Sequence, residues 1–307
     1  MEEQIQRAEQ DAAASLVELG RTLHQAGEYE KSKINLEYAI QLNPENSEAY
    51  LGRGLCYSML GIMDEAKSDL SLALEKGLEP DLARTAYLHR GATNHYLTDF
   101  EGAIKDLDLY ILDDDGDRKS LAMALLFRAD AKYVLGDLDG SLEDINRSIH
   151  YNRKFGESYA IRGRIKLNRK DYRGSCNDLS KAIEIEPTLA TDPNTLGPLG
   201  FSHYHLSRKT EAMQYWSKAI DSSPGDMYRG GLHCYLGRGT LFEQLGDKEK
   251  ALCDYQSFEK LLEQRIQLEL ESGKDLSRNR LRSRLRVSRA IHRLGIDQSE
   301  KIMGYNC

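Results

Sequence analysis

The residue types that most often carry chemistry are scattered along this chain of 307 residues. The nearest approach to a histidine cluster is His203 and His205, which are two residues apart and so do not share a helix face. The acidic run at 113–117 suggests a calcium loop, but the places that require Gly and Glu hold Arg118 and Ala124. We therefore expect neither a bound metal nor a cofactor.

Motifs for catalysis are also missing from the sequence. It contains no GxxxxGK[ST] phosphate loop, no GxGxxG after a strand and no HExxH zinc helix. An odd number of cysteines with no CxxC pair predicts reduced thiols rather than a disulfide framework; they are Cys56, Cys176, Cys234, Cys253 and Cys307. We predict that the protein is not an enzyme.

The composition is that of a soluble folded protein. Lys and Arg number 42 against 49 Asp and Glu, hydrophobic residues make up 40%, and 6 prolines exclude long Pro-rich disorder. No apolar run approaches the ~18–20 residues of a membrane span. The start, MEEQIQRAEQD, lacks the basic end and apolar stretch of a signal peptide. These features predict a cytoplasmic protein without a transmembrane segment.

The sharpest charge feature lies near the C-terminus. Residues 274–307 carry nine basic and three acidic residues, so this tail is +6 while the rest of the chain is −13. At about 100° per residue, five arginines fall within one quarter of a helix: Arg278, Arg282, Arg286, Arg289 and Arg293. The sequence predicts a basic amphipathic helix that either caps the fold or contacts an acidic partner or anionic surface. A nucleic acid is disfavoured, because interleaved aromatics are absent and the protein is acidic.

The elements that position these residues follow a repeat. Segments with matching columns succeed one another at steps of 34 to 39 residues; they start near Ala13, Ser47, Arg84, Ala122, Gly156, Pro193 and Leu232. Here they are called repeats 1 to 7. The eighth and twentieth positions are always Gly, Ala or Ser, and the twenty-fourth is always large and apolar. Small residues at two fixed places indicate two helices that approach closely.

Glycine and proline mark the helix ends within each repeat. At the fifteenth position, Gly27, Gly61, Gly136 and Gly246 can end the first helix with a positive φ. At the thirty-second, Pro44, Pro187 and Pro224 stop the second helix. One such helix pair cannot bury its apolar face alone, whereas stacked pairs can. The pattern predicts an all-α solenoid of about seven helix-turn-helix repeats.

The repeat resembles the tetratricopeptide repeat family. The closest matches are AYLGRGLCYSMLGIMDEAKSDLSLAL (49–74), SYAIRGRIKLNRKDYRGSCNDLSKAIEIEP (158–187) and LGRGTLFEQLGDKEKALCDY (236–255). The resemblance implies a right-handed α-solenoid over residues 13–265, preceded by an N-terminal helical extension (1–12). A basic C-terminal capping helix and tail (266–307) would follow. Repeat 6 departs from the pattern through Gly197, Pro198 and Gly200, which predicts a short or kinked first helix and a hinge at 190–200.

An Arg and an Asp occur together in five of the seven repeats. The seventh position is Arg where the twenty-third is Asp, and repeats 1 and 6 lack both. The predicted pairs are Arg53 with Asp69, Arg90 with Asp106, Arg128 with Asp144, Arg162 with Asp178, and Arg238 with Asp254. Because buried ion pairs are weak sources of net stability, we expect these pairs to fix the register of each helix pair.

In the family, the first helix of each repeat lines the inner surface. The resemblance therefore implies a partner-binding groove that includes Arg21, Leu55, Met59, His95, Tyr96, Tyr133, Arg164, Phe201, Tyr204 and His205. His24, Asp130 and Asn168 occupy further inward positions. Aromatic residues, Met and Arg are what the cores of protein interfaces favour.

Some members of the family grip the C-terminal tail of heat-shock chaperones with a clamp of Lys at the fifth and Asn at the ninth position. Here the fifth positions hold no Lys and the ninth hold no Asn. A chaperone tail is therefore not the expected partner.

These observations favour a non-catalytic scaffold or adaptor that binds a protein or peptide segment in its groove. The first alternative is an electrostatic adaptor that uses the Arg-rich C-terminal helix to contact an acidic partner, an anionic membrane or nucleic acid. The second is a regulatory protein whose groove is filled by its own tail.

Overall fold

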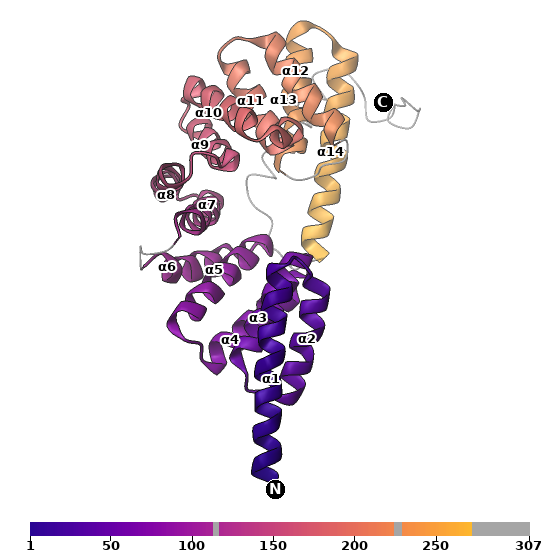
Figure 1. Ribbon diagram of the computed structural model, residues 1–307. Coiled ribbons are helices and arrows are strands. Elements are labelled where there is room, and N and C mark those ends of the chain that lie inside the picture. Colours follow the sequence, from indigo (N-terminus) through magenta and orange to yellow (C-terminus); the bar gives the residue numbers. More distant parts are fainter. Residues whose placement is uncertain (113–116, 224–228, 272–307) are drawn as a thin grey trace. The chain divides into compact units, whose positions relative to one another are not determined.

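The computed structural model describes residues 1–112, 117–223 and 229–271, and within these ranges the chain is entirely helical apart from turns (Figure 1). The all-α class is as predicted. The chain divides into two compact units, Met1–Arg153 and Lys154–Cys307, here called the N-terminal and C-terminal units.

The N-terminal unit holds repeats 1 to 4. Its helices are α1 (Glu2–Gln25), α2 (Tyr29–Leu42), α3 (Ser47–Leu60), α4 (Met63–Lys76), α5 (Pro80–Tyr96), α6 (Phe100–Ile111), α7 (Arg118–Leu135) and α8 (Leu138–Tyr151). The described part of the C-terminal unit holds repeats 5 to 7. Its helices are α9 (Gly156–Asn168), α10 (Tyr172–Ile185), the 3₁₀ turn η1 (Pro187–Thr191), α11 (Pro193–His205), α12 (Lys209–Ser222), α13 (Arg229–Leu245) and α14 (Lys248–Glu271).

Two helices extend across the domain boundaries that the sequence suggests. The expected extension at 1–12 is the exposed first part of α1, which continues into repeat 1 without a break. In the same way α14 continues past residue 265 to Glu271. No Gly or Pro interrupts the sequence of α14, so nothing in that segment ends the helix earlier.

The two helices of each repeat cross where the small eighth residue meets the large twenty-fourth. A Cβ added to Gly20 would lie 2.7 Å from Leu36 Cγ, and one added to Gly91 would lie 2.8 Å from Leu107 Cγ. In all seven repeats the twenty-fourth side chain is no more than 1% exposed. Any side chain at these glycines would therefore push the helices apart, because the space is already filled.

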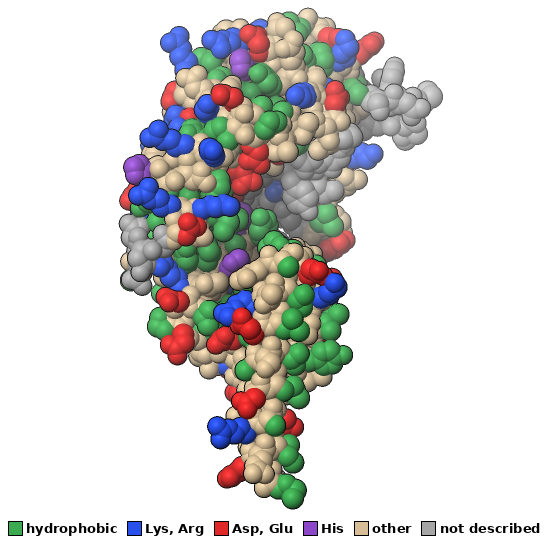
Figure 2. Space-filling model, viewed as in Figure 1, with side chains coloured by type: hydrophobic (Ala, Val, Ile, Leu, Met, Phe, Trp, Pro, Cys, Tyr) green, Lys and Arg blue, Asp and Glu red, His purple; other side chains and the backbone are tan. Residues whose placement is uncertain are grey.

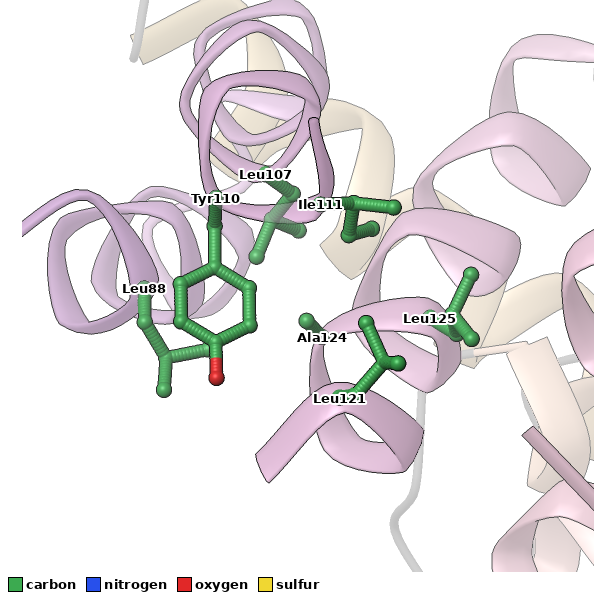
Figure 3. Packing of buried hydrophobic residues seen from close by; sticks show 7 residues of the cluster. All are labelled: Leu88, Leu107, Tyr110, Ile111, Leu121, Ala124 and Leu125. Carbon is green, nitrogen blue, oxygen red and sulfur yellow. The ribbon is translucent and has the colours of Figure 1, made fainter. Parts of the chain in front are cut away.

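Within each unit, the core of a repeat also includes the first helix of the next repeat. Figure 3 shows the junction of α5, α6 and α7, where apolar side chains of all three helices meet. They are Leu88, Leu107, Tyr110, Ile111, Leu121, Ala124 and Leu125. Within each unit, each second helix thus packs against the first helix that follows it, and successive first helices also contact one another. The first helices therefore form the inner layer within each unit.

The turn between the two helices has the same left-handed backbone in every repeat. The four glycines at the fifteenth position have φ between 77° and 93°. The other three repeats place Thr98, Lys170 and Ser207 there, and these residues have φ of 62°, 63° and 62°. Residues with a side chain are strained in this conformation, so these turns carry a local energetic cost.

Three second helices begin with an aspartate cap that faces a glycine. Asp99, Asp137 and Asp171 each accept a hydrogen bond from the backbone N–H three residues later, which belongs to a glycine in every case. A Cβ on Gly102 would lie 2.6 Å from the Asp99 carboxylate, which explains the small residue. The cap satisfies one of the backbone donors left open at a helix start.

Repeat 6 forms a first helix of normal length. Helix α11 spans 13 residues, as many as α9, although Pro198 lies inside it. The expectation of a short helix is therefore wrong. Pro193 occupies the first turn, where no backbone donor is needed, and the Asp192 side chain accepts from the Asn194 backbone N–H to cap the helix. The hinge at 190–200 stays a prediction.

Replacing Lys170 by Gly should stabilise the fold by about 0.5–1 kcal/mol, because Gly adopts a positive φ without strain. Urea unfolding followed by circular dichroism measures the change in the free energy of unfolding. The matched control is Gly136→Ala at the corresponding turn of repeat 4, which should destabilise. A neutral or destabilising Lys170→Gly would contradict the strain inferred for this turn.

Candidate functional site

Five Arg–Asp pairs join the two helices of their repeats, at the positions that the sequence indicates. In each pair Arg Nε donates to Asp Oδ2 at 2.7–2.9 Å and Nη2 donates to Oδ1 at 2.5–2.9 Å. The Asp side chains are 2–8% exposed and the Arg side chains 12–21%. This two-point geometry is the strongest form of a charged hydrogen bond.

The third nitrogen of the guanidinium reaches the preceding repeat. Arg90 Nη1 donates to Ser71 Oγ at 3.2 Å, and Arg238 Nη1 donates to Ser217 Oγ at 3.1 Å. Arg128 Nη1 donates to Asp108 Oδ1 at 2.6 Å in the same way. These three arginines therefore link neighbouring repeats as well as the two helices of one repeat.

A tyrosine at the fourth position shields four of these arginines. The guanidinium lies 5.4–6.0 Å from the centre of the ring that stands three residues earlier, on Tyr50, Tyr87, Tyr159 and Tyr235. The hydrogen bonds to Asp69 raise the pKa of Arg53, so this guanidinium stays charged. In Arg90 and Arg238 all three nitrogens and a ring face are engaged, so these two guanidinium groups are structural rather than ligands for an anion.

Removing one partner of such a pair should destabilise the fold strongly. Asp69→Ala leaves the Arg53 guanidinium half-buried without its carboxylate, and we expect a loss of about 3 kcal/mol in unfolding free energy. Arg53→Met/Asp69→Leu should cost less than Asp69→Ala alone, because no unpaired charge remains buried. A urea-unfolding double-mutant cycle with Arg53→Met measures this coupling, and additive losses would show that the pair is not coupled.

The groove residues predicted for the N-terminal unit differ in exposure. Met59 is 52% and Tyr96 60% exposed. His95 is half-buried, with its Nε2 2.9 Å from Asp130 Oδ2. The rings of His95 and Tyr96 lie against Phe127 of the next first helix, at 5.3 and 5.7 Å between ring centres. An aromatic surface therefore spans α5 and α7, with Tyr133 half-buried on α7.

In the C-terminal unit the predicted residues pack more closely. His205 is exposed and stacks on Tyr172 at 4.4 Å between ring centres. Tyr204 accepts a hydrogen bond from Gln244 of α13 at 2.5 Å. Phe201 lies against the buried Trp216, and Arg164 is half-buried on α9. The structure thus distributes the predicted groove residues between the inner layers of two compact units.

A pocket of about 230 Å³ lies in the inner layer of the N-terminal unit. It is lined from α1, α2, α3 and α5 by Val17, Gly20, Arg21, His24, Gln25, Ser32, Leu36, Glu48, Leu51, Gly52, Leu55, Leu82 and Thr85. Of the predicted groove residues, Arg21 and Leu55 belong to it. Sequence reasoning missed the rest of this lining except His24. The sequence feature that could have indicated the pocket is Gly52, because most other repeats have a larger residue at the sixth position.

Burial keeps two histidines of this unit neutral. Burial lowers the pKa of His24, which lines the pocket. Burial, with a smaller contribution from His24, lowers the pKa of His89 on α5 to about 4. Both rings are therefore uncharged at pH 7, so neither attracts an anion to this surface.

His89 should make the fold sensitive to mild acid. In the unfolded chain its pKa is about 6.5, so between pH 6.5 and 4 the unfolded state binds the proton and the folded state does not. Stability should therefore fall as the pH drops, by about 2 kcal/mol between pH 7 and 5 for this group. Urea titrations at both pH values compare the wild type with His89→Gln, which should lose this part of the dependence. If His89→Gln loses as much unfolding free energy between pH 7 and 5 as the wild type does, His89 is not the source of the pH dependence.

The outer side of α2 carries an exposed apolar stripe, which can be compared with the exposed residues of the inner layer. Ile34, Tyr38 and Leu42 are four residues apart, and their exposed fractions are 46%, 55% and 37%. Figure 2 shows apolar side chains gathered over this helix. Tyr38 thus has nearly the exposure of Tyr96 but lies on a second helix rather than in the inner layer.

The described residues bear on the expectations for cysteines, metal ligands and membrane spans. Cys56, Cys176 and Cys234 are buried free thiols, but Cys253 is disulfide-bonded, so the expectation of reduced thiols is wrong for that residue. Spacing along the chain does not reveal such a bond, because its partner can be distant in sequence. The described residues contain no group of three His, Cys, Asp or Glu placed to hold a metal ion. Among the described helices, none has the length and apolar character of a membrane span.

Two sequence features lie outside the described residues. They are most of the acidic run, at 113–116, and the arginine stripe of Arg278, Arg282, Arg286, Arg289 and Arg293.

Comparisons with known proteins point to one repeat family. A sequence profile of the tetratricopeptide repeat matches residues 17–77. The chain is 25% identical over 245 residues to protein CTR9 homolog of Arabidopsis thaliana, covering 75% of this chain and 20% of that protein. It is 25% identical over 206 residues to tetratricopeptide repeat protein 6 of Homo sapiens, covering 67% of this chain and 38% of that protein. The chain therefore spans less than half the length of either relative.

Solved structures share the fold at low sequence identity. The APC/C hetero-tetramer Cut9–Hcn1 matches with a TM-score of 0.64 at 14% identity, over 90% of this chain and 48% of that chain. A tetratricopeptide repeat protein from Parabacteroides merdae matches with a TM-score of 0.57 at 16% identity, over 91% of this chain and 99% of that chain.

Proposed function

We propose that this chain is a tetratricopeptide repeat protein that binds an extended segment of a partner protein on its inner helices and performs no chemistry, and the profile match at residues 17–77 supports this. The expected cytoplasmic location is part of this proposal.

The observation that carries the proposal is the exposed aromatic and sulfur-containing surface of the inner layer. Met59 and Tyr96 are more than half exposed, although they lie on first helices among packed repeats. Tyr, Met and Arg supply large contact areas in interface cores at low entropic cost. The surface therefore has the composition of a docking site for a polypeptide.

The chemistry-bearing side chains support a role without catalysis. Five aspartates are held in two-point pairs with arginine, and Asp99, Asp137 and Asp171 cap helices. Side chains committed to such contacts are poor acids, bases or nucleophiles, because reaction would break the fold that they hold. We infer that the protein acts by presenting a surface.

Selection from a library of displayed 16-residue peptides tests this proposal on the full chain. Fluorescence anisotropy then gives the Kd of each selected peptide for the wild type and for variants. Met59→Ala/Tyr96→Ala should weaken binding at least tenfold, about 1.4 kcal/mol, because exposed Met and Tyr would be central contacts. Tyr38→Ala, the matched control on the outer side of α2, should leave the Kd unchanged.

Two results would contradict the proposal. One is a library that yields no binder above background. The other is a Kd that changes with Tyr38→Ala but not with the inner pair of substitutions. A chain ending at Gly273 serves as a third protein, since loss of binding only there would favour the electrostatic alternative based on the arginine stripe. Circular dichroism verifies that every variant remains helical.

A further inference from the structure

The pocket of the N-terminal unit exists because two glycines face one leucine. A Cβ added to Gly20 of α1 would lie 2.7 Å from Leu36 Cγ, and one added to Gly52 of α3 would lie 3.0 Å from both Leu36 methyl groups. Leu36 therefore fills the gap between these two backbones only as far as its methyl groups reach. Beyond them the pocket of about 230 Å³ remains.

The C-terminal unit has the same arrangement with a larger side chain. Gly200 of α11 and Gly237 of α13 hold the equivalent positions, and a Cβ on either would lie 2.5 or 2.7 Å from the ring of Trp216. This ring is 1% exposed, and its N–H donates to the Gly197 carbonyl at 3.3 Å. An indole thus fits between two glycine-faced first helices of this chain.

Repeats 3 and 4 carry a larger side chain at the position that corresponds to Gly52. The sixth position, where Gly52 and Gly237 stand, holds His89 in repeat 3 and Phe127 in repeat 4. In repeat 2 the sixth position is Gly52, and the facing twenty-fourth residue is Leu36, which is smaller than the Trp216 that faces Gly237. The pocket of about 230 Å³ is lined by Leu36 and by both glycines that face it.

The walls of the pocket suit an aromatic group with a polar edge. Val17, Leu51 and Leu82 supply apolar surface, and the exposed Arg21 and Glu48 mark an opening to solvent. His24 Nε2 is buried in this region and has no hydrogen-bond partner among the described residues. A buried nitrogen without a partner is unfavourable, so a donor or acceptor carried by an occupant would satisfy it.

We propose that this pocket binds an aromatic side chain of the partner segment, with an indole preferred. The inference rests on the proposed function, because it names the anchor residue of the segment that the inner layer would bind. A volume of about 230 Å³ is smaller than the ~300–1,000 Å³ of sites for drug-sized molecules, and so suits a single large side chain. Indole burial between glycine-faced helices would repeat the contact that Trp216 makes within the chain.

A direct titration tests the pocket without any partner. N-acetyltryptophanamide is added to the full chain labelled at Leu and Val methyl groups, and methyl NMR spectra follow the shifts. Saturable shifts should appear at Val17, Leu36, Leu51, Leu55 and Leu82, with a Kd on the order of 1 mM, while Leu42 on the outer side of α2 should not shift. N-acetylalaninamide should produce no saturable shift. The absence of saturation, or shifts elsewhere only, would overturn the proposal.

Filling the pocket provides the complementary test. Leu36→Trp copies the side chain that stands at this position in repeat 6, and it should weaken N-acetyltryptophanamide binding at least tenfold. Gly52→Ile copies repeat 5 and should have the same effect, so the test does not depend on the folding of one variant. Tyr38→Trp adds an indole on the outer side of α2 and should leave the binding unchanged. Wild-type affinity in a folded Leu36→Trp or Gly52→Ile variant would overturn the proposal.

The two proposals can fail separately. If Met59→Ala/Tyr96→Ala weakens the selected peptides while N-acetyltryptophanamide does not bind, the scaffold stands and the pocket assignment is wrong. If N-acetyltryptophanamide binds in the pocket but the library yields no peptide, the pocket is a binding site and the polypeptide partner is wrong.

Discussion

The crossing of the two helices in each repeat sets the distances on which the rest of the fold depends. A glycine, or alanine in repeat 4, lies so close to the facing twenty-fourth side chain that no larger residue has room. This close approach buries Leu36 and its counterparts almost completely. It also places the Ser32 hydroxyl 2.6 Å from the Gly20 carbonyl, and Ser141 repeats the contact with Ala129. Small residues at the crossing therefore serve both the apolar packing and the polar contacts beside it.

The charged pairs follow from the same geometry. The arginine at the seventh position directly precedes the small eighth residue, and the aspartate at the twenty-third directly precedes the large twenty-fourth. The two side chains therefore face each other across the same gap in each of these repeats. Their separation of 16 residues along the chain is the same in all five pairs. Where the pair is missing, repeat 6 buries Leu199 instead, while repeat 1 leaves Leu19 46% exposed. The crossing thus tolerates either an ion pair or an apolar contact, and the pair adds a link to the preceding repeat.

Much of this architecture could be predicted from the sequence because it repeats. Seven aligned copies reveal the small crossing residues, and the joint absence of Arg and Asp from two copies indicates the pairing. The three left-handed turns at Thr98, Lys170 and Ser207 could not be read from residue type, because their conformation is imposed by the neighbouring helices. The expectation of a short first helix in repeat 6 is wrong for a related reason, since the Asp192 cap helps α11 reach 13 residues despite its glycines and proline.

The binding surfaces were harder to predict than the fold. Inward positions such as Met59 and Tyr96 could be derived from the repeat register, but exposure depends on what the neighbouring repeats present. The pocket depends on the lack of a side chain at Gly52 and on the size of the Leu36 side chain in the adjoining repeat. Neither residue is unusual when its own repeat is considered alone. Such a site becomes visible only when facing positions of two repeats are compared in three dimensions.

The constant separation of 16 residues has a consequence for how the chain acquires its structure during synthesis. Every crossing contact and every Arg–Asp pair closes a short loop, so its formation requires no distant part of the chain. Proteins dominated by such local contacts fold quickly, and a ribosome adds only about 5–20 residues per second. Each helix pair can therefore form soon after it emerges and then provide the surface on which the next pair assembles. The order of the repeats in the sequence would become the order in which they fold.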